Sequence, residues 1–157
     1  MIYRLVLAVA VMTALVGATA PALSTARADA ASGAMERQLD ELGAELTTLV
    51  ETDDATANGD ARRAVEIRLP PRSYTNAGVS RLQFAERAGV GVATWTVESR
   101  KRTERLVGIP IQTTASTDRL DEPGTHRLVF VLTRSDSQRV LRVHRFKSEA
   151  AARNDHA

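Results

Sequence analysis

The sequence predicts an α+β protein, in which one long N-terminal helix, apolar and then amphipathic, packs on an antiparallel meander sheet of about five to six strands. Two patterns support this fold class. Before residue 52 apolar residues recur at steps of three and four, the period of a helix. After residue 64 they recur at every second position, the period of a strand. A chain of 157 residues suits one domain of this kind.

The first element is an uncharged apolar segment, residues 5–26, between Arg4 and Arg27. As a helix rising about 1.5 Å per residue, it would match the roughly 30 Å hydrocarbon core of a membrane. Residues 1–27 are therefore expected to form a single-span anchor in the cell membrane that contacts lipid through residues 5–26, with the C-terminal domain extracytoplasmic. The alternative is a signal peptide, cleaved after Ala20 or Ala30, that leaves a secreted protein.

The second element, within residues 28–60, is an acidic amphipathic helix followed by a turn-rich loop. Its apolar stripe starts at Met35, and the acidic residues lie on the opposite face. A sheet with one apolar face needs a cover, and this stripe is the candidate. The residues expected to pack between helix and sheet are Leu39, Leu42, Leu46, Leu49, Trp95 and Phe130.

The third element is an antiparallel sheet domain, residues 61–147, followed by a disordered tail, residues 148–157. Short connections favour a meander. Besides Trp95 and Phe130, Phe84 and Phe146 are expected in the core. The strands are expected at about 64–69, 81–84, 94–98, 103–112, 128–133 and 140–146, with a basic turn at 99–102 and a hairpin connection at 134–138.

The charges are divided between the two parts. Residues 28–60 carry nine acidic side chains and one arginine, a net charge of −8, whereas residues 61–157 carry 18 basic and 10 acidic side chains, a net charge of +8. Parts of opposite sign attract each other, within a chain or between chains.

The layout of an apolar helix that continues into an amphipathic one, with Pro21 near its twentieth residue, and then a small antiparallel sheet resembles type IV pilins and their minor relatives. The run from Val65 to Pro70 after an acidic loop, with the closing hairpin, also resembles a family of small haloarchaeal membrane-anchored proteins. Such families are often encoded beside pilus or secretion-system genes. The resemblance implies an extracytoplasmic structural or interaction protein with protein partners in a surface assembly.

No constellation of catalytic or metal-binding residues emerges from the sequence. Cysteine is absent, which excludes thiol chemistry. His126 and His144 fall on the last two expected strands, where surface positions are favoured over a metal site. The acidic loop around Asp121 lacks the ligand spacing of a calcium loop, and Gly89 and Gly91 fit a hairpin turn. We therefore expect no enzyme activity, catalytic residue, metal, cofactor or small-molecule substrate.

Two basic clusters are the strongest polar features, and they are the candidate contacts for an anion or a partner: Arg100, Lys101, Arg102 and Arg105, and Arg139, Arg142 and Arg145. One interpretation is that they solvate strand faces and meet the acidic helix. The other, which accompanies the signal-peptide alternative, is a secreted module that binds an anionic ligand. No nucleic acid is expected, because only 4% of the residues are aromatic and stacking platforms are lacking.

Overall fold

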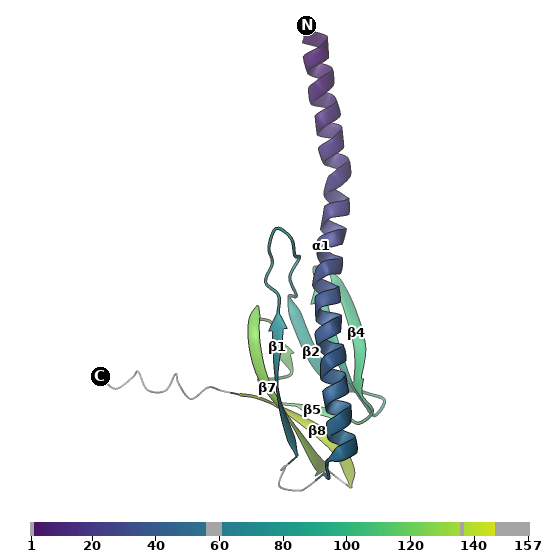
Figure 1. Ribbon diagram of the computed structural model, residues 1–157, viewed down its shortest axis with the longest axis vertical. Helices are drawn as coiled ribbons and strands as arrows, with labels where there is room; N and C mark the ends of the chain where they lie inside the picture. The colour runs from purple at the N-terminus through teal and green to yellow at the C-terminus, as the bar shows by residue number, and fades with distance from the viewer. Residues whose placement is uncertain (1, 56–60, 136, 147–157) are drawn as a thin grey trace, which may run out of the picture.

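The computed structural model describes residues 2–55, 61–135 and 137–146, and the side chains of these residues except 2 and 15–21. The expected tail, residues 148–157, lies outside the described residues. One helix, α1 (Ile2–Thr52), precedes eight strands that form two four-stranded sheets in the described part of the chain. The second half of α1 runs along the sheets, and its first half projects beyond them (Figure 1). The α+β class is confirmed, whereas the expectation of a single meander sheet is wrong.

The first sheet has the order β1-β7-β8-β5. Strand β1 (Arg62–Leu69) pairs antiparallel with β7 (Gly124–Ser135), so that Arg62 lies opposite Val131 and Leu69 opposite Gly124. Strands β7 and β8 (Gln138–Arg145) form an antiparallel hairpin, as the sequence predicts. Strand β5 (Ile111–Thr113) pairs parallel with β8, which a meander does not allow.

The second sheet has the order β4-β3-β2-β6 and is antiparallel throughout. Its strands are β2 (Arg81–Arg87), β3 (Val90–Val97), β4 (Arg100–Val107) and the short β6 (Arg119–Leu120). Ala88 and Gly89 turn the chain between β2 and β3 with φ values of 51° and 79°. Positive φ at both turn positions matches the twist of a tight hairpin.

Two sequence expectations fail around β4. The expected strand at 103–112 is two strands, because β4 ends at Val107 and β5 begins at Ile111, after Pro110. Proline lacks the N–H that a continuous ladder needs. Residues 100–102, expected in a basic turn, are the start of β4. The turn instead lies at Glu98 and Ser99, and Glu98 has a φ of 55°.

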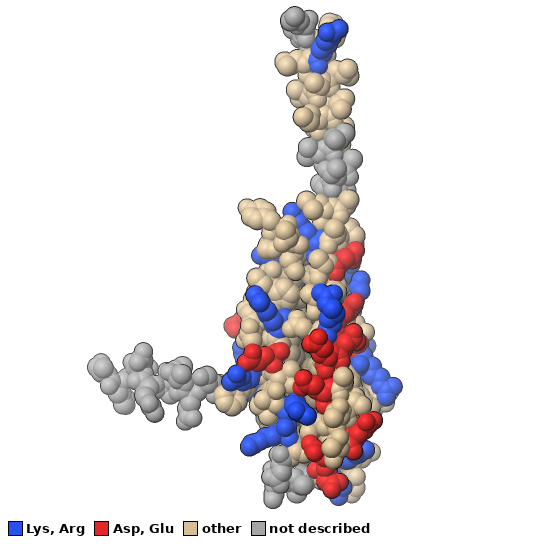
Figure 2. Space-filling model, in the orientation of Figure 1, with Lys and Arg blue, Asp and Glu red and all other residues tan. Residues whose placement is uncertain are grey.

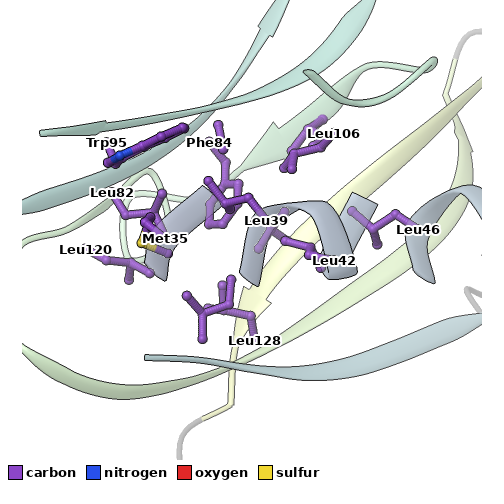
Figure 3. Packing of buried hydrophobic residues seen from close by; sticks show 14 of the residues in the cluster. Met35, Leu39, Leu42, Leu46, Leu82, Phe84, Trp95, Leu106, Leu120 and Leu128 are labelled. Carbon is purple, nitrogen blue, oxygen red and sulfur yellow. The ribbon is translucent and has the colours of Figure 1, made fainter. Parts of the chain in front are cut away.

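The core lies between α1 and the two sheets (Figure 3). Met35, Leu39, Leu42, Leu46 and Leu49 of α1 are each 0–1% exposed. Their steps of three and four keep them on one helix face. From the sheets they meet Trp95 and Phe130, together with Phe84, whose ring stands edge-on to that of Phe130 with centroids 5.8 Å apart. All six residues expected at the helix–sheet contact are therefore in one core.

Phe146, expected in the core, is 53% exposed. It follows the last residue of β8, and its ring lies 5.6 Å from the guanidinium carbon of Arg127. A cation over an aromatic face attracts it without burial, so Phe146 holds a surface contact instead of a core position.

Helix α1 packs between β1 and β4, which are edge strands of different sheets. On the β1 side, the Gln38 amide accepts a hydrogen bond from Arg68 N (2.9 Å) and donates one to Arg68 O (3.1 Å). On the β4 side, a Cβ on Gly43 would lie 3.1 Å from Leu106 O. Any larger residue at position 43 would hold the helix away from β4.

The indole of Trp95 links β3 to α1 through a hydrogen bond, its Nε1–H donated to Ser32 Oγ at 3.1 Å. Both residues are buried. We expect Ser32→Ala to lower the free energy of unfolding by about 1–3 kcal/mol, because the buried N–H loses its acceptor. Urea unfolding followed by fluorescence of Trp95, the chain's single tryptophan, measures this. Ser116→Ala, which removes an exposed hydroxyl, is the control; equal midpoints for the two variants would contradict the expectation.

Candidate functional site

The projecting half of α1 carries large apolar side chains that are mostly exposed. Leu5, Val6 and Leu7 are 59–70% exposed. Successive helical residues point about 100° apart, so these three already face different sides of the helix. The exposed apolar residues of this half are Tyr3, Leu5, Val6, Leu7, Val9, Val11, Met12 and Leu23.

The expected single-span location in the cell membrane is corrected by the structure. Among the described residues, no helix is both long enough and apolar enough to cross a membrane.

The acidic face of α1 lies beside basic side chains of the sheets, and Figure 2 shows Asp and Glu gathered along the packed half of the helix. One pair joins the two directly, since Arg102 Nη1 of β4 donates to Glu36 Oε1 of α1. Both side chains are 40–49% exposed. An exposed pair of this kind contributes little to stability, about 0–1 kcal/mol.

Glu104 is the unusual acid of this interface. It follows Arg102 by two positions on β4 and therefore faces the helix, where it makes a side-chain hydrogen bond with Asp40. Burial, then the hydrogen bond and the negative charge of Asp40, and then the charge of Glu36 raise the pKa of Glu104 from 4.5 to about 7. Its Oε2 is buried without a hydrogen-bond partner. A surface cavity of about 440 Å³ is lined by these four residues with Trp95 and Thr103.

The two basic clusters lie on different sheets and do not form one patch. Arg100 and Lys101 are exposed at the start of β4, and Arg102 is paired as described. On β8, Arg142 Nε donates to Gln112 Oε1 at 3.4 Å. Arg145 Nη2 lies 3.8 Å from Glu122 Oε2 and donates to His126 Nδ1 at 3.0 Å.

Arg105 and Arg139, one from each cluster, line a common cavity. Its volume is about 510 Å³, and it lies where α1 ends beside the end of β4. Arg139 Nη1 donates to the Val50 carbonyl at 2.9 Å, which gives an unpaired carbonyl of the last helical turn a donor.

The two histidines expected on the surface have different environments. His144 is exposed, whereas His126 is 4% exposed. Since arginine can only donate, His126 Nδ1 accepts from Arg145, and Nε2–H therefore donates to the Glu122 carbonyl at 2.7 Å. The ring is held by two structural contacts, and no cluster of three or more metal-ligating side chains occurs among the described residues.

A family model described as a domain of unknown function, DUF7311, matches residues 2–146. The chain belongs to the DUF7311 family. No curated protein and no solved structure matches it. The match to DUF7311 includes both the projecting helix and the sheets, so the two parts are features of one family unit.

Sequence reasoning missed Glu104 and Gln38 in this DUF7311 chain. The signal available for Glu104 was its position two residues before Leu106, since residues two apart on a strand share a face. An inward-facing charge beside a buried leucine indicates an interface with a polar partner. For Gln38 the sequence holds no signal, because its contact with Arg68 depends on where the helix lies.

Proposed function

We propose that this protein is a structural or interaction component of a pilin-like assembly, in which the projecting half of α1 packs against the same segment of other copies. The observation that carries the proposal is the exposure of Leu5, Val6, Leu7 and their neighbours on all sides of one helix. A helix that is apolar all round is normally buried by several neighbours. Large exposed apolar surfaces mark interaction sites.

Copies of the same chain fit this segment for two reasons. Of the described residues 3–14, Arg4 alone is charged, so identical helices can lie side by side with little repulsion. The other half of the helix is fixed along the sheets, which leaves the projecting half in a defined direction (Figure 1). A helix held rigidly by its domain loses less freedom on association than a flexible segment does.

Sedimentation velocity of the full chain, in buffer without detergent, tests the proposal. The native chain should form oligomers, and the triple variant Leu5→Gln, Val9→Gln, Met12→Gln should associate at least about tenfold more weakly, since burying each such side chain contributes about 1.5–3 kcal/mol. Circular dichroism should show the fold retained, because these residues contact no core.

Tyr74→Gln is the matched control, because Tyr74 is 91% exposed but lies on the sheet domain. This variant should sediment as the native chain does. A native chain that is monomeric at tens of micromolar, or a triple variant that associates as strongly as the native chain, would overturn the proposal.

A further inference from the structure

The cavity at the C-terminal end of α1 is lined by residues that are far apart in the sequence. Its wall comes from the last turns of the helix, from residues 105–109 at and beyond the end of β4, and from Arg139 at the start of β8. A volume of about 510 Å³ lies within the usual range for small-molecule sites, roughly 300–1,000 Å³.

The cavity has an apolar floor. Val50, Leu106 and Val107 are 4–8% exposed, and Ile109 is partly buried against the same core. Such a floor favours the aliphatic part of a ligand, by roughly 25 cal/mol for each Å² of apolar surface removed from water.

The charged groups at the cavity are two guanidinium groups and one carboxylate. Arg139 uses one N–H for the Val50 carbonyl and has further N–H groups to donate. Within the part of the chain that the structure describes, neither Arg105 nor Glu51 forms an ion pair within 4.0 Å, although both line the cavity. The cavity therefore carries one excess positive charge and unused hydrogen-bond donors.

We propose that this cavity binds an aliphatic monocarboxylate, with the carboxylate held by Arg105 and Arg139 and the hydrocarbon chain on the floor of Val50, Leu106 and Val107. Guanidinium groups match a carboxylate in charge and planar geometry. A single negative charge suits the site better than a phosphate, because Glu51 and the carbonyl end of the helix repel further negative charge. The proposal gives a chemical class to the anionic ligand of the second interpretation of the basic clusters, and it is independent of assembly through the projecting helix.

Equilibrium dialysis of the full chain with radiolabelled hexanoate tests the site. Hexanoate should bind saturably, hexylamine should not compete, and hexanol should compete at least about tenfold more weakly, since it lacks the charge that the arginines recognise. Arg105→Gln should weaken hexanoate binding about tenfold, the loss expected for hydrogen bonds to a charged group.

Arg100→Gln provides the control, because it removes the same charge from the same strand outside the cavity and should leave binding unchanged. Glu51→Gln should tighten binding, because it removes a negative charge from the cavity wall that repels the bound carboxylate. Equal affinities of Arg105→Gln and Arg100→Gln, or equal binding of hexanol and hexanoate, would overturn the proposal. Weaker binding by Glu51→Gln would do so as well.

Discussion

Replacing Glu104 with glutamine should remove a loss of stability that the native chain shows between about pH 4.5 and pH 7. The folded state raises the pKa of Glu104 to about 7, whereas the unfolded chain leaves it near 4.5. In this window the folded state holds a proton that the unfolded state releases, so the free energy of unfolding falls as the pH rises. The stabilisation that comes from protonated Glu104 is complete below pH 4.5 and is lost as the pH rises through 7.

The physical cause is a contact between two acids across the helix–sheet interface. When Glu104 is protonated, it can share its proton with Asp40, and only one of the two carries a charge. When Glu104 is ionised, its charge is partly buried and is repelled by the negative charges of Asp40 and Glu36. Glutamine keeps an N–H donor for Asp40 at every pH and cannot ionise.

Urea unfolding of the native chain and of Glu104→Gln at several pH values from 4.5 to 8 gives the measurement. The difference between the two curves should change by about 1–3 kcal/mol over this range. Glu66→Gln is the control, since Glu66 is a 54% exposed carboxylate paired with Arg127 on the other sheet. A Glu104→Gln curve that keeps the native slope would show that another group causes the pH dependence.

Leu42→Ala should have the largest effect on stability of the single substitutions considered. Leu42 is 1% exposed and lies on the helix face that covers both sheets (Figure 3). Its truncation removes apolar contacts and leaves a cavity between rigid elements, which costs about 2–5 kcal/mol. The midpoint of urea unfolding should fall accordingly, with the slope of the transition unchanged.

Leu7→Ala is the same chemical change on the projecting half of the helix, where Leu7 is 66% exposed. In dilute solution, where association is negligible, it should alter the free energy of unfolding by less than about 0.5 kcal/mol. Similar losses for the two variants would mean that the packed half of α1 is no better anchored than the projecting half.

The helix and the longer strands were predictable because their periods are repeated several times. The leucine stripe from Leu39 to Leu49 and the alternation of Val65, Ile67 and Leu69 repeat the helix and strand periods within single segments. The division into two sheets was not predictable. Strands β5 and β6 have three and two residues, too few to show a period, and the pairing of β1 with β7 joins segments far apart in the chain.

The candidate site was predictable only in part. Charge clustering identified Arg105 and Arg139, but sequence order placed them in separate groups with the five other basic residues. Their convergence depends on the end of β4 and the start of β8 both lying near the last turn of α1, which follows from the sheet topology. The apolar segment was recognised from its composition. Its membrane location was inferred from its length, its lack of charge and the preceding Arg4, and it is corrected because no described helix is long and apolar enough to cross a membrane.

The hydrogen bonds between Gln38 and Arg68 bear on how the protein avoids aggregation. Strand β1 is an edge strand of its sheet, and an edge strand offers free N–H and C=O groups to any extended peptide. At Arg68 the side-chain amide of Gln38 occupies both groups, as a neighbouring strand would. A further strand therefore cannot pair with β1 at Arg68, which limits edge-to-edge aggregation at that point of the sheet.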